Sequence, residues 1–496
     1  MLTILTTTEQ SEDVKSAIQS VERLDELVTV VGNPKEIAEI NHLVVADGEI
    51  VSPYDWYDTK PPYLIPSVRY STQNLLAIVF YALGNHQRSF EFVEEGSALY
   101  NHLLAGTNLQ FGYPFSEDFL NFISENSAHN FAIVHYYGHT PEQKSPDSLK
   151  LLFRKAIDDS QNDEEKIFTL KHYLNLLLDL GDEKEAKRLI KEKRKLAISE
   201  EAKLALDIHL AAILKEELTL PYDRKRLDEI LNLQLKGIES FEKKGLKTQA
   251  GLLLMEAAEL ANFKEDFITS KELINKSIQY FKDDDVSELL GEAGLKKAVL
   301  LYTWSKNGNP QYYKAAINAF QDVLKIFKRD THPQQFADVH HNLALIYSEI
   351  PVGADEKPMW TAFCASSFKE VLNYYTENQF PYEHAMASHN YATALMSFPP
   401  AKIHDNLQRA KELFELALQI RTADRYPLER ALTLLNYLEL GWLTHNEGAE
   451  AEQKKYEDMK AQAEEIKTLT SDPELIAKAE AHLSELDKLK TLIESK

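Results

Sequence analysis

The sequence predicts an all-α solenoid of helical hairpins behind a small mixed α/β segment at residues 1–65. Three observations predict it. A chain of 496 residues exceeds what one hydrophobic core usually supports. Glycine and proline contribute only 17 and 18 residues, so long helices are rarely interrupted. Three C-terminal segments share landmark residues at intervals of 48 and 46 positions, and a fixed period is the sequence sign of a repeat protein.

The N-terminal segment alternates strand and helix patterns. β-branched runs at residues 2–6, 27–31 and 42–46 predict strands, and the stretches 12–24 and 34–40 predict helices between them. The proline-rich run 61–66 predicts a rigid extended connector, because proline blocks helix formation and restricts the residue before it. We therefore expect the solenoid to occupy residues 66–470 and an amphipathic helix at 471–496 to cap it.

The C-terminal repeats align without gaps over their cores. Their shared landmarks are phenylalanines, prolines and asparagines, at Phe320, Phe368 and Phe414, at Pro333, Pro381 and Pro427, and at Asn342, Asn390 and Asn436. A small residue precedes each phenylalanine by four positions, at Ala316, Cys364 and Ala410. Both residues then lie on one helical face, where the small residue lets two helices approach and the aromatic ring fills the groove. The pattern indicates stacked helical hairpins.

The first helix of these repeats resembles that of the tetratricopeptide repeat superfamily. Residues 337–347 read A-D-V-H-H-N-L-A-L-I-Y, and Asn342, Leu343, Ala344 and Tyr347 stand at matching places, whereas His340 replaces the usual tryptophan. The family repeat has 34 residues, so longer loops or helices must hold the excess here. Earlier segments keep the family spacing better, at Ala77, Gly84, Ser89 and Val93 and at Leu174, Gly181, Ala186 and Ile190. The resemblance implies a right-handed superhelical solenoid.

The resemblance also implies a binding site. In peptide-binding members of the family, an asparagine at the place of Asn342, Asn390 and Asn436 faces the concave surface and bonds the ligand backbone. One amide supplies both a donor and an acceptor, so it can satisfy an extended peptide's N–H and C=O. His341 and His389 share one phase and are expected in the same groove. Each asparagine could instead contact only the next helix or water.

Patterns that would indicate chemistry are weak. Cys364, the only cysteine, takes the small-residue position of its repeat, which favours packing over reactivity. His135 and His139 are one turn apart, but Gly138 interrupts the helix and no H-E-x-x-H pattern occurs. The glycine-containing run 291–297 lacks the spacing of a phosphate-binding loop. We therefore expect no catalytic residue, no metal site and no cofactor.

Charge narrows the class of partner. The formal net charge of −23 disfavours nucleic acid and anionic membranes, which leaves a protein or peptide. The N-terminus lacks a signal-peptide pattern and no segment has the apolar run of a membrane span, so we expect a cytoplasmic protein. Nothing in the pattern specifies an oligomeric state.

Three functions remain open. A scaffold or adaptor that binds a partner in the concave groove is favoured, because solenoids create extended binding surfaces. A ligand- or peptide-responsive regulator would need a deep aromatic pocket, for which the candidates are Tyr136, Tyr137, Tyr374 and Tyr375. An enzyme with an N-terminal active site is disfavoured, because the segment 1–65 is short and has no phosphate-binding glycine pattern.

Overall fold

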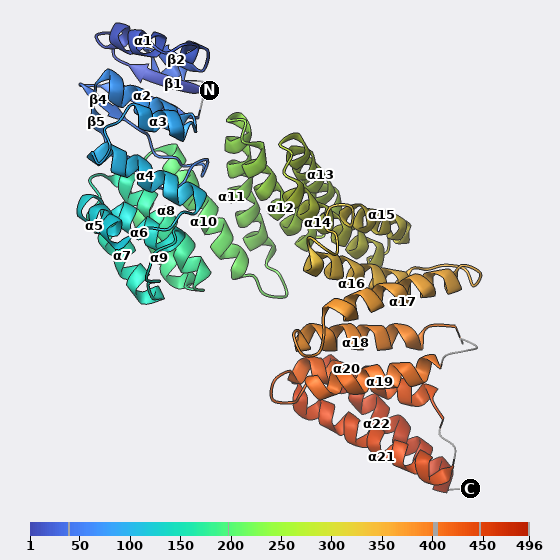
Figure 1. Cartoon of the computed structure of the whole chain (residues 1–496). Helices are drawn as coiled ribbons and strands as arrows, with labels where there is room; N and C mark the ends of the chain where they lie inside the picture. The colour runs from blue at the N-terminus through green and yellow to red at the C-terminus, as the bar shows by residue number, and fades with distance from the viewer. Residues whose placement is uncertain (38–39, 197, 400–404, 446–447, 495–496) are drawn as a thin grey trace. The chain divides into compact units, whose positions relative to one another are not determined.

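The computed structural model describes residues 1–37, 40–196, 198–399, 405–445 and 448–494 (Figure 1). The chain divides into two compact units, Met1–Lys264 (unit 1) and Glu265–Lys496 (unit 2). This division differs from the predicted boundaries after residues 65 and 470. Helices dominate both units, and the strands described lie at the start of unit 1.

Unit 1 begins with a five-stranded sheet. Its strands are β1 (Leu2–Thr6), β2 (Val28–Val31), β3 (His42–Ala46), β4 (Glu49–Val51) and β5 (Val68–Arg69), in the order β2-β1-β3-β4-β5. Strand β1 pairs in parallel with β2 and β3, while β4 runs antiparallel to β3 and β5. The three predicted strands are confirmed. The last strand lies beyond the predicted boundary at residue 65.

The predicted N-terminal helices are shorter in the structure. Helix α1 spans Ser11–Gln19, and residues 34–37 of the expected helix at 34–40 contain only a 3-10 turn, η2 (Pro34–Glu36), while residues 38 and 39 lie outside the described part of the chain. A second 3-10 turn, η1, covers Leu24–Glu26. The apolar side chains of β1 and β3 pack with α1 and with the first long helix, α2 (Thr72–Ala82), in one core. The sheet is therefore built into the helical array through α2.

Helices pair along the rest of unit 1. They are α3 (His86–Glu91), α4 (Ala98–Phe111), α5 (Glu117–Asn126), α6 (Ala128–Tyr137), α7 (Pro146–Asp158), α8 (Asp163–Asp179), α9 (Glu183–Lys193), α10 (Glu200–Glu216), α11 (Arg224–Lys243) and α12 (Lys247–Phe263). Gly84 and Gly181, which keep the family spacing, follow α2 and α8 with φ of +78° and +67°, a conformation that commonly ends a helix. Left-handed backbone at these positions favours glycine because it has no Cβ.

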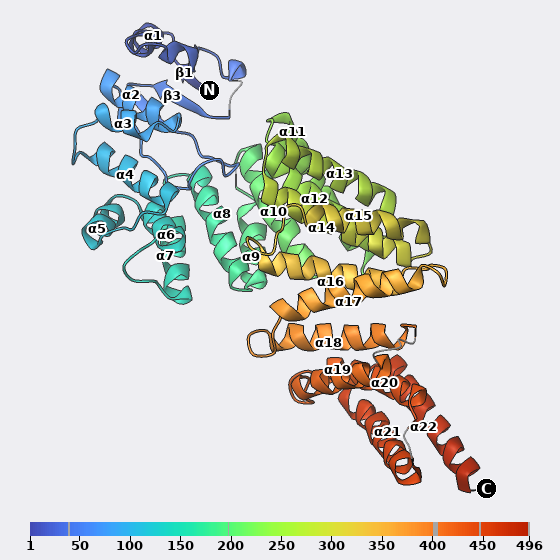
Figure 2. The ribbon, with the colours of Figure 1, turned by 45° about the vertical axis from the view of Figure 1, so that its right-hand side comes forward.

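Residues 52–67, which we call the strap, join β4 to β5 without regular helix or strand. The two strands that the strap connects are antiparallel neighbours, which a short turn could have joined. The chain instead leaves the sheet, runs over the helices of unit 1 and returns (Figure 2). The predicted connector at 61–66 is the second half of this excursion.

Unit 2 consists of helical hairpins. Its elements are α13 (Phe267–Asp283), α14 (Ser287–Lys306), η3 (Pro310–Tyr312), α15 (Tyr313–Val323), α16 (Pro333–Glu349), α17 (Lys357–Tyr374), α18 (Pro381–Met396), α19 (Asn406–Ile420), α20 (Pro427–Leu443), α21 (Ala449–Leu469) and α22 (Pro473–Glu494). Both views show α16, α17, α18 and α19 stacked in chain order (Figures 1 and 2).

The predicted repeat core is confirmed in unit 2. Phe320, Phe368 and Phe414 are fully buried, and so are the small residues Ala316, Cys364 and Ala410 one turn before them. The three aligned prolines each begin a helix, at α16, α18 and α20. In the predicted cap, α22 buries Leu475, Ala479 and Leu486 in one cluster with residues of α20 and α21. The chain is thus a helical repeat protein with a small N-terminal sheet.

Candidate functional site

The predicted asparagines and histidines of unit 2 form a ladder between successive first helices. Asn390 Nδ2 on α18 lies 2.8 Å from His341 Nε2 on α16. Asn436 Nδ2 on α20 lies 3.3 Å from His389 Nε2 on α18 and donates to Thr393 Oγ1 at 2.9 Å. The structure therefore brings the asparagine of one repeat to the histidine of the repeat before it.

Asn342 is the member of the set that turns back on its own helix. Its Nδ2 donates to the carbonyl oxygen of Asp338 at 2.9 Å, one turn earlier. The side chains of all three asparagines are half-buried, so they are partly open to solvent. Contacts with the neighbouring helix, the alternative left open by the sequence, are thus present for Asn390 and Asn436. Contact with a partner stays a prediction.

Burial fixes the protonation state of the ladder histidines. Burial lowers the pKa of His341 to about 4, and burial with the nearby Arg421 guanidinium lowers that of His389 to about 4. Both rings are therefore neutral near pH 7 and can accept a hydrogen bond at Nε2. Donation from an asparagine Nδ2 requires this state, which places the ring proton on Nδ1.

Unit 1 contains the same sequence element, which the repeat alignment missed. His129-Asn130-Phe131-Ala132 on α6 has the pattern of His341-Asn342-Leu343-Ala344 and His389-Asn390-Tyr391-Ala392. The recurring H-N-x-A tetrapeptide was the available signal. The alignment compared only the C-terminal repeats, and this tetrapeptide lies far from them in the sequence.

Asn130 holds the strap by its backbone. The amide N–H of Leu64 donates to Asn130 Oδ1 at 2.7 Å, and Asn130 Nδ2 donates to the Leu64 carbonyl at 2.7 Å. His129 adds a third bond, because its Nε2 donates to the Pro62 carbonyl at 2.9 Å. A histidine–asparagine pair at the first-helix position therefore binds an extended segment without using the segment's side chains.

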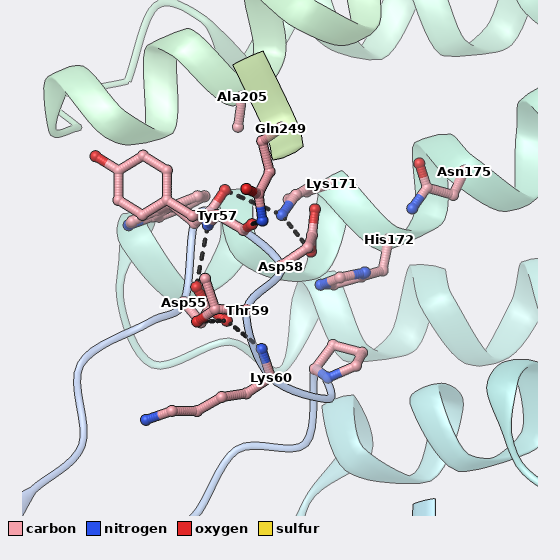
Figure 3. A network of polar contacts seen from close by, with 12 residues as sticks. Asp55, Tyr57, Asp58, Thr59, Lys60, Lys171, His172, Asn175, Ala205 and Gln249 are labelled. Carbon is pink, nitrogen blue, oxygen red and sulfur yellow. Dashed lines mark hydrogen bonds and ion pairs between the residues drawn. The ribbon is translucent and has the colours of Figure 1, made fainter. Parts of the chain in front are cut away.

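Side chains of α8 and α12 also bind the strap (Figure 3). Lys171 on α8 stands three residues before Leu174, as His129 stands before Ala132. Its side chain is only 5% exposed, and its Nζ donates to Asp58 Oδ1 at 2.6 Å and to the Trp56 carbonyl at 3.2 Å. Gln249 Nε2 on α12 donates to the Tyr57 carbonyl at 3.5 Å. Polar side chains of α6, α8 and α12 therefore contact the strap along its length.

Aromatic packing supports these polar contacts. Tyr54 and Trp56 contact Phe168 of α8, with ring centroids 5.3 and 5.5 Å apart, and Tyr57 contacts Phe241 of α11 at 6.0 Å. The Tyr63 hydroxyl lies 2.9 Å from His102 Nδ1 on α4. Asp55 stabilises the turn of the strap by accepting from backbone and side-chain donors of the strap itself, at Tyr57, Thr59 and Lys60.

The histidines beneath the strap are neutral. Burial lowers the pKa of His102 to about 4, and it does the same for His129 although the bond to Pro62 opposes the shift. Burial, followed by the Lys171 charge, lowers the pKa of His172 well below its ordinary value. His172 Nδ1 meets the Tyr137 hydroxyl at 3.2 Å, and its buried Nε2 has no partner among the described residues.

The weak chemical patterns have structural roles. Cys364 is fully buried, and burial raises the pKa of its thiol to about 12, so the thiol stays protonated. Gly291, from the glycine-containing run, faces the ring of Phe327 so closely that a Cβ would lie 2.6 Å from it. No three histidine, cysteine or acidic side chains come together as a metal site in the described part of the chain. None of its helices combines the length and apolar character of a membrane crossing.

Comparison with known proteins gives a loose likeness in fold. No family model matches the sequence, and no curated protein matches it. One similar solved structure is a Signal Transduction ATPase with Numerous Domains that carries a tetratricopeptide repeat sensor, from Pyrococcus horikoshii. It is 15% identical with a TM-score of 0.45, over 98% of this chain and 83% of that chain. A circular tandem repeat protein is also 15% identical with a TM-score of 0.20, over 85% and 95%.

Proposed function

We propose that the protein is a cytoplasmic scaffold of the tetratricopeptide type, a right-handed solenoid without catalysis. Its unit 2 would bind an extended segment of a partner protein along the ladder of His341, Asn342, His389, Asn390 and Asn436. The observation that carries the proposal is the clamp of Asn130 on both backbone groups of Leu64. The same position of the hairpin already binds an extended chain in unit 1.

The ladder has the groups that this mode of binding needs. Nδ2 of each asparagine is engaged within unit 2, whereas Oδ1 accepts no hydrogen bond from another described residue. A partner's backbone N–H could donate to each Oδ1, spaced by one repeat, while neutral histidines orient the amides of Asn390 and Asn436 and the Asp338 carbonyl orients that of Asn342. The net charge of −23 favours a protein partner over nucleic acid.

The test replaces the three asparagines by alanine together. Affinity purification with the wild-type chain identifies the partner, and calorimetry compares both proteins with it. Each lost amide leaves a partner group without its bond at about 1 to 3 kcal/mol, so the triple variant should bind at least about a hundredfold more weakly.

A matched control carries Asn318→Ala, Asn373→Ala and Asn378→Ala, three exposed positions of unit 2 outside the ladder. It should bind with wild-type affinity. Equal affinity of the ladder variant and the wild type, with both folded, would exclude the ladder as the binding surface.

A further inference from the structure

Unit 1 contains a cavity of about 850 Å³, one wall of which is the strap. A volume of this size is in the range of sites for small molecules. Its lining is rich in aromatic rings, which come from the strap, α2 and α8, at Tyr54, Trp56, Tyr57, Tyr63, Tyr81 and Phe168. The cavity therefore offers flat apolar walls to a ligand.

A lysine at this cavity lacks an acidic partner. Lys60 Nζ donates to Asn41 Oδ1, and no carboxylate of the described residues forms an ion pair with it. Its side chain extends away from the nearby Asp55 carboxylate, which is occupied by donors of the strap (Figure 3). Lys60 as a whole is exposed, but partial desolvation lowers the pKa of its ammonium group, with Asp55 opposing the shift.

Two of the three acidic residues of the lining, Asp55 and Glu164, accept hydrogen bonds from other groups of the chain. Glu164 accepts from the backbone N–H and the hydroxyl of Ser199. Glu201 lies in the first turn of α10, where the helix dipole favours a negative charge. Lys244, at the end of α11, adds a second positive charge to the lining. Neither Lys60 nor Lys244 forms an ion pair with a described carboxylate, so each can pair with an anionic group of a ligand.

We infer that this cavity binds a small anionic molecule with an aromatic body, whose anionic group pairs with Lys60 while its ring packs beside Trp56. A cation in a partly desolvated site attracts an anion more strongly than one in water. Charge-assisted hydrogen bonds are also about twice as strong as neutral ones. The inference is independent of the proposed partner site, because the cavity and the ladder lie in different units.

The probe for the test is 8-anilinonaphthalene-1-sulfonate, an anionic aromatic dye, titrated into the full chain. Trp56 is the only tryptophan of residues 1–264, and the other three lie in unit 2, so the part of the energy transfer that Trp56→Phe removes reports binding in this cavity. The inference predicts one saturable site with this transfer. Lys60→Gln should weaken binding roughly tenfold, whereas Lys60→Arg, which keeps the charge, should retain it.

Two controls distinguish charge-dependent binding from nonspecific hydrophobic binding of the dye. Lys184→Gln removes an exposed lysine of α9 that does not line the cavity, and it should leave the affinity unchanged. The neutral dye N-phenyl-1-naphthylamine should bind the wild type and Lys60→Gln equally. The inference is overturned if Lys60→Gln binds the anionic dye like the wild type, or if Trp56→Phe leaves the energy transfer intact.

Discussion

At the scale of single residues, Phe368 shows what holds a repeat together. Its ring is fully buried, stacks on Tyr391 with centroids 4.8 Å apart and follows Cys364 by one turn. Phe368→Ala should lower the free energy of unfolding of unit 2 by about 3 to 5 kcal/mol, the usual cost of an emptied aromatic site. Phe363 lies on the same helix but is 46% exposed, so it is the matched control. Phe363→Ala should lower the free energy of unfolding much less. Equal losses in urea titrations of the two variants would contradict the assigned register.

At the scale of elements, the strap is the segment whose attachment can be tested within the molecule. Asn130→Ala removes two hydrogen bonds of 2.7 Å to Leu64, each with a net value of about 1 kcal/mol. Local opening of the strap should then become about tenfold more frequent or greater, measured as faster deuterium exchange or proteolysis at residues 52–67. Asn126→Ala, at an exposed end of α5, is the control. Unchanged exchange in Asn130→Ala would show that the amide does not hold the strap.

The strap also shows which elements the sequence could not predict. Equal spacing of Phe320, Phe368 and Phe414 indicates the hairpins, because a repeated core needs the same residue at the same place. The proline-rich run 61–66 predicts an extended chain but contains nothing about where that chain binds. Its partners on the helices, and those of the preceding strap residues, lie 39 to 192 positions away in the sequence. Such pairings depend on tertiary packing and have no local pattern.

At the scale of the whole molecule, buried neutral histidines should set the acid limit of stability. Burial lowers the pKa to about 4 for residues of both units, at His102, His129, His341 and His389. Unfolding restores the ordinary value near 6.5, so the unfolded chain binds more protons between these limits and stability falls as pH falls from 6.5 towards 4. Each histidine contributes up to about 1.4 kcal/mol per pH unit. Thermal melts at pH 7.5, 6.5 and 5.5 should show a falling midpoint, and a constant midpoint would contradict the burial.

The division into two units is a further property that the sequence did not predict. Helix α12 ends at Phe263 and α13 begins at Phe267, so the boundary falls in a short connection like those elsewhere in the chain. Composition does not change there, whereas the β-branched runs of residues 2–46 predicted three of the five strands of the sheet. The ladder was predicted in position through Asn342, Asn390 and Asn436, but the pairing of Asn390 with His341 depends on the distance between neighbouring repeats.

The central claim is that a partner lies along the ladder of unit 2, and site-specific photo-crosslinking tests it most directly. Thr393 is exposed on α18 and accepts a hydrogen bond from Asn436, whereas Lys369 is exposed on the second helix α17. A photoreactive amino acid is placed at one position or the other, and the purified partner is added before irradiation. If the partner lies along the ladder, position 393 should crosslink to one continuous segment of the partner, and position 369 should crosslink little. Crosslinking from position 369 alone, or equally from both, would contradict this claim.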